Sequence, residues 1–442
     1  MVNTALSSDS DSSSTSSGTA NVGTRVDRVR PAAAAAIGNA LQFYDFFLYA
    51  TAAAIVFNTV FFPSGRPVVS MIGAYASYAV GFVSRPLGGI VFGHVGDRFG
   101  RKITMVWTLS LMGVSTALIG LLPTFAQVGL GAPVMLVLLR LIQGFAAGGE
   151  WGGGILMCTE NAPPGRRGFY GAFSQAGVGF GFVLSSGAFY AMQRMSGHGF
   201  LTWGWRVPFL LSVVVVAAGL LIRSRVPESA EFRSACDEVS SRQPVREVLR
   251  EHGRVLLISG GLLLAEMCGP LLTTTFALAY GALCGVTSDI LLLGVLLSMI
   301  VDTCAMLGFG YLSDRIGRGP VYAFGICGLG LFITPFFLFV GSGHPVLIVF
   351  GFILANGLFH AAMIGVQPAL LTELFPVSVR ASGLALTQSI ASVLVGFLPL
   401  GATALFYATG SILPISGGMI AICMVSLLAL RAAFRRLATS RV

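Results

Sequence analysis

Long apolar stretches separated by short polar segments recur along this chain from about residue 32 to about residue 433. A helix needs about 20 apolar residues to cross ~30 Å of hydrocarbon, because each residue adds ~1.5 Å. The pattern therefore predicts twelve membrane-spanning helices, at approximately 32–60, 71–93, 103–122, 133–158, 169–193, 205–223, 254–282, 289–311, 320–341, 345–371, 382–408 and 411–432. The stretches are apolar on all sides and do not alternate in polarity, which excludes a transmembrane β-barrel.

Composition supports a chain that lies in lipid. Of 442 residues, 55% are hydrophobic and 10% are charged, and the mean hydropathy is +0.83. Too little polar surface remains to cover a soluble protein of this size. The 57 glycines would weaken helices in water, but small residues allow membrane helices to pack closely. The predicted class is an all-α integral membrane protein.

A net charge of +9 is compatible with a nucleic-acid partner, so the distribution of the 27 basic residues decides between nucleic acid and membrane. If both termini are cytoplasmic, the outer loops hold only Arg66, Arg194 and Arg206, while Arg85 and Arg140 fall inside spans. All other basic residues then lie on the cytoplasmic side, as the positive-inside rule requires. We therefore expect a multi-pass protein of the cell membrane with both termini in the cytoplasm and no nucleic-acid partner.

The polar segments divide the chain into five parts. They are a disordered cytoplasmic tail at 1–31, a first six-helix half at 32–223, a cytoplasmic connector at 224–253, a second half at 254–433 and a short cytoplasmic tail at 434–442. The connector is too short for a soluble domain, holds at most one amphipathic helix and carries no nucleotide-binding loop, which disfavours ATP-driven pumping. The seven cysteines are scattered without metal-ligand spacing, so we expect no metal, no cofactor and no obligate protein partner.

Two motifs occur twice, in matching order. GHVGDRFGRK begins at Gly93 after the second predicted span, and GYLSDRIGR begins at Gly310 after the eighth. The pattern E-x6-R occurs at 160–167 and again at 373–380, at the ends of the fourth and tenth spans. The nearly equal offsets indicate two parallel repeats of six helices each.

The doubled GxxxDRxGR loop resembles the signature of the major facilitator superfamily. Four further segments resemble its metabolite:proton symporter family: NALQFYDFFLY from Asn39, RPLGG from Arg85, RLIQGFAAGGEWGG from Arg140 and ENAPPGRRGFYG from Glu160. Members of that family import shikimate, citrate, oxoglutarate, other carboxylates, proline or betaine together with protons. The resemblance implies the major facilitator fold, in which two six-helix halves rock around a central site.

We expect the doubled motifs to form a cytoplasmic gate, because their acids and arginines lie where helix ends converge. Ion pairs among them would hold one conformation of a rocking transporter and separate in the other. The predicted gate residues are Gly93, Asp97, Arg98, Arg101, Glu160, Arg167, Gly310, Asp314, Arg315, Arg318, Glu373 and Arg380. The alternative is that these residues only fix topology and turn geometry.

Ionisable residues inside the spans mark candidate sites, since each costs ~2.5–3.5 kcal/mol at the bilayer centre. Helical rise places Asp45, Arg85 and Glu150 ~15–20 Å from the cytoplasmic edge, with Arg140 further outward. Asp45 or Glu150 would carry the coupled proton. Arg85 or Arg140 would hold a substrate carboxylate. The alternative is a static salt-bridge network within the first half.

The second half contains two acids at similar depth, Glu266 and Asp302, and we expect no basic residue of that half to be an obvious partner. Burial disfavours the charged form of an unpaired acid, so each is a candidate proton carrier. The alternative is a neutral acid that hydrogen-bonds to a neighbouring helix.

Other polar and aromatic residues of the spans could complete a substrate site. They are Gln42, Tyr44, Tyr49, Trp151, Tyr280, Asn356, His360 and Gln388. Aromatic residues in spans also pack or anchor at interfaces, and a single histidine can simply satisfy a helix–helix hydrogen bond.

The expected function is import of a small carboxylate-bearing metabolite, an organic acid or zwitterion, by proton symport through alternating access. A proton-independent facilitator or an efflux antiporter on the same fold is the alternative, and a nutrient receptor that does not transport is a further one. An enzyme is disfavoured, because no nucleophile–base pair or HExxH-type metal site stands out.

Overall fold

The structure, a computed structural model, describes residues 40, 43–99, 101–148, 155–156, 158–159, 162–163, 165–224, 244–376 and 379–439. Every regular element among these residues is a helix. After helical residues 43–52, the first half contains η1 (Ala53–Phe57), α2 (Asn58–Val60), α3 (Pro67–Val83), α4 (Arg85–Phe99), α5 (Arg101–Leu121), α6 (Phe125–Val128), α7 (Gly131–Ala147), α9 (Arg167–Ser196), η2 (Gly197–Gly199), η3 (Phe200–Gly204) and α10 (Arg206–Ser224).

The regular elements among the described residues of the second half are likewise all helices. It contains α13 (Gly253–Pro270), η4 (Leu271–Phe276), α14 (Ala277–Leu283), α15 (Ser288–Ile316), α16 (Arg318–Gly341), α17 (Pro345–Phe352), η5 (Ile353–His360), α18 (Ala361–Ile364), α19 (Gln367–Leu374), α20 (Arg380–Gly396), α21 (Leu398–Thr409) and α22 (Leu413–Thr439). Before it, α12 (Pro244–Glu251) forms the short helix expected in the connector. The exact boundaries of the two halves stay a prediction.

The lengths of the helices match a membrane-spanning bundle. In the described part, eight helices are long and apolar enough to cross a membrane, and the segments Arg167–Gly204 and Arg206–Leu221 pass the same test together across an 89° bend. Two shorter apolar helices, Val106–Leu121 and Gly131–Ala147, lie at the third and fourth predicted spans. A helix thus occurs at each of the twelve predicted positions, which confirms the all-α, twelve-helix fold.

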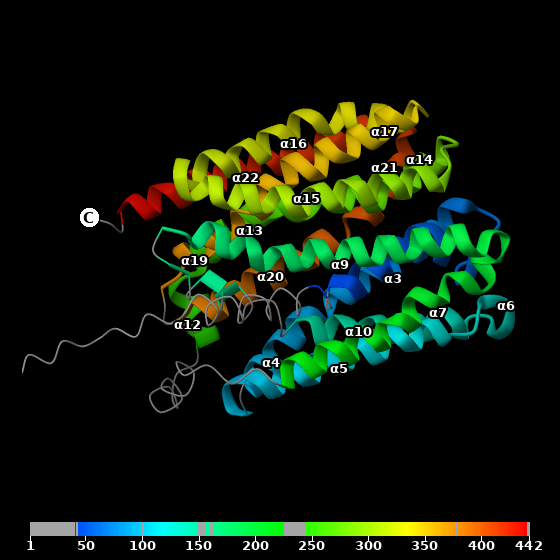
Figure 1. The fold of residues 1–442 in the computed structure, drawn as a ribbon, viewed down its shortest axis with the longest axis horizontal. Coiled ribbons are helices and arrows are strands. Elements are labelled where there is room, and N and C mark those ends of the chain that lie inside the picture. Colours follow the sequence, from blue (N-terminus) through cyan, green and yellow to red (C-terminus); the bar gives the residue numbers. More distant parts are fainter. Residues whose placement is uncertain are drawn as a thin grey trace, which may run out of the picture.

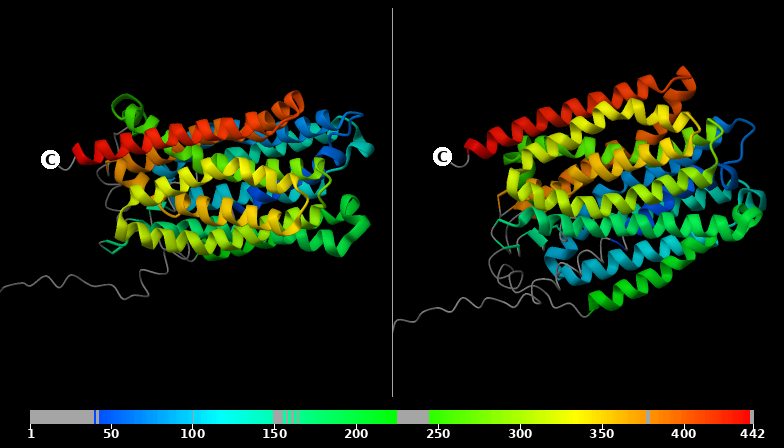
Figure 2. Two further views of the ribbon diagram at one scale, coloured as in Figure 1. Left: turned by 90° about the horizontal axis from the view of Figure 1, so that it is seen from above. Right: turned by 45° about the horizontal axis from the view of Figure 1, so that its top comes forward.

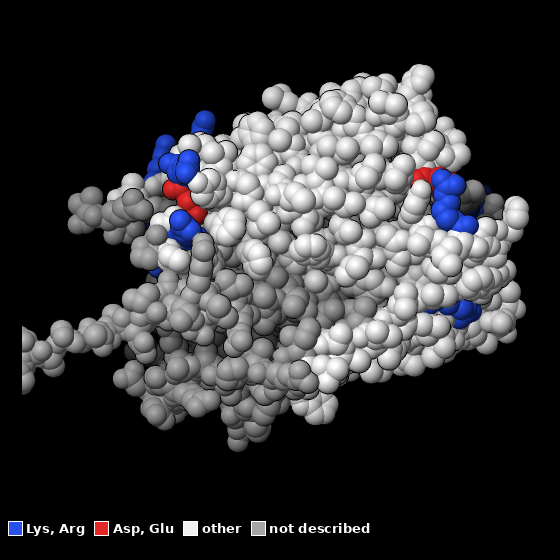
Figure 3. All heavy atoms as spheres, viewed as in Figure 1, with Lys and Arg blue, Asp and Glu red and all other residues white. Residues whose placement is uncertain are grey.

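The long helices run roughly parallel, so the bundle has two ends (Figures 1 and 2). The connector helix α12 and α19 lie at one end, here called the α12 end, and α6 lies at the other, the α6 end (Figure 1). Charged side chains gather at both ends of the face shown in Figure 3, with an uncharged band between them. That distribution suits a bundle whose middle lies in hydrocarbon.

The two halves meet along two seams. Helix α9 of the first half packs along α15 of the second, and α3 packs against α20 and α21. Figure 1 shows α9 and α15 side by side through the middle of the molecule. Any site shared by the halves must therefore lie between these two seams.

Glycine permits the close approach of α9 and α15. A Cβ atom added to Gly310 would lie 2.5 Å from Ala172 Cβ and 2.9 Å from the carbonyl oxygen of Gly168. A Cβ atom on Gly168 would lie 2.5 Å from the carbonyl oxygen of Gly310. The glycine that opens the second doubled motif is thus required by backbone packing between the halves.

We predict that Gly310→Val lowers the unfolding temperature of the detergent-solubilised protein, because overpacking a tight contact costs about 1–3 kcal/mol. Gly308→Val is the matched control, since a Cβ atom at Gly308 on the same helix meets nothing within 4 Å. Thermal unfolding of both variants checks the prediction. Equal unfolding temperatures would contradict the importance of this crossing.

Candidate functional site

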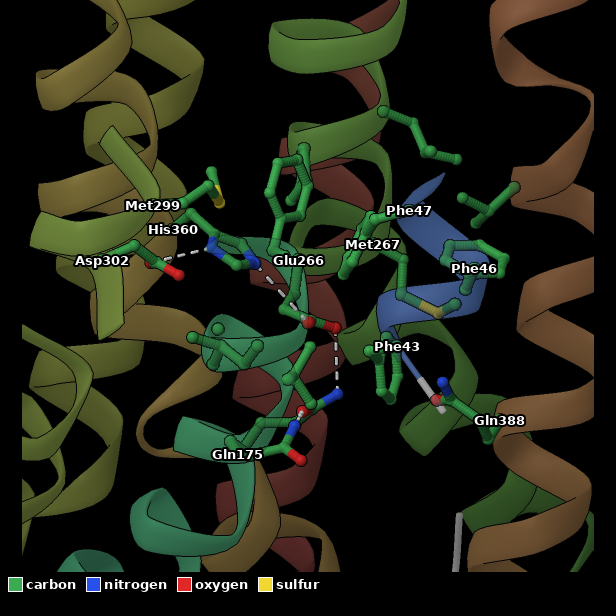
Figure 4. A pocket seen from close by; sticks show the side chains of 18 of the residues that line it. Phe43, Phe46, Phe47, Gln175, Glu266, Met267, Met299, Asp302, His360 and Gln388 are labelled. Atoms are coloured by element: carbon green, nitrogen blue, oxygen red, sulfur yellow. Dashed lines mark hydrogen bonds and ion pairs between the residues drawn. The ribbon is translucent and has the colours of Figure 1, made fainter. Parts of the chain in front are cut away.

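A cavity of about 80 Å³ lies between the halves (Figure 4). Five phenylalanines of the first half line one side, namely Phe43, Phe46, Phe47, Phe82 and Phe182. Its polar side chains are Gln175, Glu266, Asp302, His360, Gln367 and Gln388. Because one water needs about 10–15 Å³ on the same measure, the cavity can hydrate these groups.

Three of the polar groups form a buried chain of titratable side chains. His360 Nδ1 lies 3.0 Å from Asp302 Oδ1, and His360 Nε2 lies 3.7 Å from Glu266 Oε1 (Figure 4). Either Nδ1–H donates to the Asp302 carboxylate or a protonated Asp302 donates to Nδ1. All three side chains are buried, so a proton on this chain is shielded from bulk water.

The structure corrects the expectation that these two acids lack a basic partner. Asp302 comes from α15, Glu266 from α13 and His360 from the end of η5, where three helices meet. Two π-helical stretches, η4 and η5, adjoin this site, and Thr273 Oγ1 of η4 donates to Asn356 Oδ1 of η5 at 2.6 Å. The extra residue of each π-helical turn changes which side chains face inward, a shift that a regular helical repeat does not predict.

The chain of hydrogen bonds continues through two glutamines. Gln367 Nε2 donates to Glu266 Oε2 at 2.9 Å, and Gln175 Nε2 donates to Gln367 Oε1 at 3.1 Å. Gln175 belongs to α9 and Gln367 to α19, so this last bond joins the two halves. Neither glutamine was predicted from the sequence, although amides within apolar stretches were the available signal.

A second, smaller cavity lies in the first half and shares Phe46 and Phe82 with the larger one. Arg85 and Arg140 both line it. The Arg85 guanidinium carbon lies 4.7 Å from the Phe82 ring centre, and that of Arg140 lies 4.2 Å from the Tyr49 ring centre. Aromatic faces stabilise a desolvated cation by about 1–2 kcal/mol, which helps to keep both arginines charged within the bundle.

Arg140 is held in place by its neighbours. Its Nη1 donates to Gln143 Oε1 at 3.1 Å, and Gln143 Nε2 donates to Thr116 Oγ1 at 2.7 Å. Asp45 lines the same cavity and interacts electrostatically with Arg140. A Cβ atom on Gly81 would lie 2.6 Å from Arg140 Nε, so the glycine leaves room for the guanidinium. The arrangement is a preorganised cationic pocket with an acid beside it.

The other predicted substrate residues differ in their surroundings. The Tyr44 hydroxyl donates to the Pro208 carbonyl oxygen, and the Tyr49 hydroxyl donates to Ser77 Oγ. Tyr280 packs among Phe276, Phe337 and Phe406. Among the described candidates, His360 and Gln388 line the larger cavity and the two arginines line the smaller one. Gln42, Glu150 and Trp151 lie outside the described residues, and all of these roles stay predictions.

At the α12 end, Asp314 caps the first turn of α9. Its Oδ1 accepts the backbone N–H of Gly168 at 2.8 Å, and its Oδ2 accepts that of Phe169 at 3.0 Å. Helix α9 has no side-chain cap of its own, so an acid from the other half satisfies its first amides and its positive dipole end. The second doubled motif thus connects the halves directly.

Other predicted gate residues surround this cap. Arg318 Nη2 lies 2.8 Å from Glu373 Oε1 and 3.9 Å from Asp314 Oδ1. Arg315 instead stacks on the Tyr311 ring at 4.6 Å, and Arg380 Nε donates to the Phe375 carbonyl oxygen. Arg167 is the first residue of α9 and is exposed. Glu160, the surroundings of Gly93 and the side chains of Asp97, Arg98 and Arg101 lie outside the described part, so the first-half gate stays a prediction.

The α6 end carries a contact between the same two helices. Arg194, in the last turn of α9, lies 3.4 Å from Asp289, in the first turn of α15, and both side chains are exposed. An exposed pair contributes at most about 1 kcal/mol, so it can open without a large cost. The α9–α15 seam is therefore closed by polar contacts at both ends.

A possible metal-ligand group lies outside both cavities. In the part of the chain that the structure describes, the side chains of Glu247, Glu251 and His252 come close enough to share an ion. They lie at the partly exposed connector helix α12 and its end. Nothing else at this position points to a ligand.

Comparison with known proteins places these features in a family. A family model described as sugar (and other) transporter matches residues 32–251 and 234–434. The chain is 40% identical to the shikimate transporter of Escherichia coli K12 over 413 residues, covering 91% of this chain and 93% of that protein. It is 31% identical to the proline/betaine transporter of Escherichia coli K12, covering 83% and 75%.

Solved structures with a similar fold include xylose transporters. The proton:xylose symporter XylE bound to 6-bromo-6-deoxy-D-glucose matches with a TM-score of 0.73 at 18% identity, covering 93% of this chain and 96% of that one. An inward-open form of the xylose transporter from E. coli matches with a TM-score of 0.67 at 19% identity, covering 91% and 95%. At this identity the likeness concerns the fold alone.

We predict that Asp314→Asn frays the start of α9, because an amide side chain replaces a charged cap worth about 1 kcal/mol. Trypsin should then cut after Arg166 or Arg167 about fivefold faster, since cleavage follows the population of the opened turn. Arg315→Gln, from the same motif but outside the cap, should leave the cleavage rate unchanged. Equal rates for wild type and Asp314→Asn would contradict the cap.

Proposed function

Because the chain belongs to the sugar (and other) transporter family of the major facilitator superfamily, we propose that it imports a small carboxylate-bearing metabolite together with protons. Membership makes it a multi-pass secondary transporter and not an enzyme. Proton symport, the carboxylate substrate, the cell membrane and the cytoplasmic termini are the proposed refinements. They are supported by the charged groups of the two cavities and by the distribution of arginine along the chain.

One observation carries the proposal: a cavity with two arginines adjoins a cavity with a titratable chain, and the two share Phe46 and Phe82. Arg85 and Arg140 would hold the substrate carboxylate, since guanidinium groups bind carboxylates with charge-assisted, bidentate hydrogen bonds. The phenylalanines would cover the apolar part of the substrate. The relatives named as shikimate and proline/betaine transporters fit a substrate that carries a carboxylate.

Proton coupling would arise from competition for the arginines. Asp45 lies beside Arg140 and, when charged, opposes a second anion in the same pocket. A proton on Asp45 would remove this competition, so that substrate and proton favour each other's binding. Glu150 could serve the same purpose from the first half. In the second half, Glu266 and Asp302 would bind a proton through His360, which contacts both.

Transport would follow from rocking of the halves around the cavities. The α9–α15 seam carries the Asp314 cap at the α12 end and the Arg194–Asp289 pair at the α6 end. Each cytoplasmic or outer opening would break one set of these contacts and keep the other. Joint binding of substrate and proton would lower the cost of the change, and an inward proton gradient would drive accumulation.

The first test is uptake into liposomes that contain the purified protein, with and without an inward proton gradient. The solutes are labelled shikimate, citrate, oxoglutarate, proline and betaine. We predict that one of them accumulates only with the gradient. Asp45→Asn should lose accumulation but keep exchange of labelled for unlabelled solute, because the acid that couples the proton is gone. Gradient-independent uptake would instead support a facilitator, and absence of uptake for every solute would support a receptor.

The second test concerns the arginine pocket. We predict that Arg140→Lys raises the KM for the transported carboxylate about tenfold, because lysine keeps the charge but loses the planar bidentate contact. Arg66→Lys, the same substitution in an exposed loop, should leave KM unchanged. Initial uptake rates at several substrate concentrations measure both. An unchanged KM in Arg140→Lys would place the carboxylate elsewhere.

A further inference from the structure

The hydrogen bond between Gln175 and Gln367 is a buried polar contact on the α9–α15 side of the interface. Its partners are 192 residues apart, and each glutamine is only 2% exposed. Along α9, Gln175 lies between the Asp314 cap at Gly168 and the ion pair at Arg194. Through Gln367 it reaches Glu266 in two hydrogen bonds. A carboxyl group is therefore connected directly to a contact between the halves.

The direction of these hydrogen bonds depends on the charge of Glu266. An ionised carboxylate only accepts hydrogen bonds, so Gln367 must turn its NH₂ group toward Glu266. The Gln367 oxygen then faces Gln175 and accepts its N–H, as observed. The charge on Glu266 thus fixes the orientation of one amide, and that amide fixes the orientation of the next.

A proton on Oε2 of Glu266 would reverse the direction of these hydrogen bonds. A proton on Oε1, the oxygen nearest His360, would leave the Gln367 hydrogen bond unchanged, whereas an O–H group at Oε2 needs the Gln367 oxygen as its acceptor. Gln367 would then present its NH₂ group to the NH₂ group of Gln175, two donors facing each other. The conflict is relieved if Gln175 turns its own oxygen, which is buried without a hydrogen-bond partner among the described residues, or if the halves separate at this point.

We propose that Gln367 and Gln175 transmit the protonation of Glu266 to the contact between the halves. The inference rests on the proposed proton symport, and it assigns both glutamines as positioning residues. With Glu266 charged, each N–H donor in the amide chain faces an oxygen acceptor, and the halves stay joined along α9. With Glu266 protonated on Oε2, the chain is mismatched unless Gln175 turns, and turning leaves the buried NH₂ group of Gln175 without its present acceptor. Proton loading would thereby favour the conformational change directly.

Other titratable groups face Glu266 and are compatible with this role. His360 of η5 and, beyond it, Asp302 of α15 form the titratable chain. From α16, Tyr322 lies near Glu266, but its hydroxyl donates to the Leu262 carbonyl oxygen. Cys268 lies on α13 itself, and its thiol interacts electrostatically with Glu266 and with Cys423 of α22. From α9 and α20, the polar side chains that line the cavity are the amides of Gln175 and Gln388.

The test measures proton-driven uptake against pH in liposomes for Gln367→Met, Gln175→Met and the double variant. Methionine keeps the volume of glutamine and removes its donor and acceptor. Gln367→Met removes the donor that stabilises charged Glu266. The pH midpoint above which uptake falls should therefore rise by about one pH unit. Gln175→Met should move it in the same direction, although Gln175 does not contact Glu266. The double variant should equal Gln367→Met alone, since the two residues act in series.

Two matched controls separate this effect from a general one. Gln193→Met changes the same residue type on the same helix, and Gln388→Met changes an amide of the same cavity that is outside the hydrogen-bonded chain. Both control variants should keep the wild-type pH midpoint of uptake. This applies to Gln388→Met even when its KM for the solute changes. If Gln175→Met fails to fold, Gln175→Glu replaces it. A carboxylate at that position cannot donate to Gln367, so the midpoint should again rise.

The outcomes distinguish the two proposals. If wild-type uptake does not depend on the proton gradient, the proposed symport is wrong and the link falls with it. If wild-type uptake is gradient-driven but Gln175→Met keeps the wild-type midpoint, the link is wrong while the symport stands. A midpoint shift in both single variants without further shift in the double variant supports the link.

Discussion

The requirement that buried polar groups find partners inside the protein governs this structure. A membrane bundle offers its polar side chains no bulk water, and an unsatisfied or unpaired group there costs several kcal/mol. Arg140 accordingly lies over the Tyr49 ring and beside Gln143, while His360 lies between two acids. Each such arrangement needs side chains from several helices. The polar groups therefore determine how the helices face one another within the bundle.

The same requirement concentrates the contacts between the halves on a few polar groups. Along α9 and α15 these are the cap by Asp314, the ion pair of Arg194 and Asp289, and close to them the amides of Gln175 and Gln367. On the other seam, the Tyr75 hydroxyl of α3 donates to the Thr275 carbonyl oxygen of η4. Packed interfaces switch between discrete arrangements and do not deform continuously. A transporter that must adopt two arrangements is served by discrete contacts that are either made or broken.

The two halves contribute different kinds of side chains to the cavities. The first half gathers cations and aromatic rings around the smaller cavity, and the second half gathers the acids and the histidine at the larger one. Opposite charges on the two sides make each half sensitive to what binds in the other. Phe46 and Phe82 line both cavities and so lie between the two charged regions.

The sequence by itself determined the twelve helices, their membrane environment and the repeat, because hydropathy and motif spacing are properties of the chain alone. It also pointed to the buried charges, since any ionisable residue in an apolar stretch is conspicuous. Only the tertiary structure decided which of them meet. The titratable chain joins three residues that are far apart in sequence, namely Asp302, Glu266 and His360. The π-helical turns at η4 and η5 also change which residues share a face of a helix, so a regular helical repeat does not predict that the three meet. Gln175 and Gln367 became visible for the same reason: a hydrogen bond depends on direction and distance in space, and neither follows from the spacing of residues along a chain.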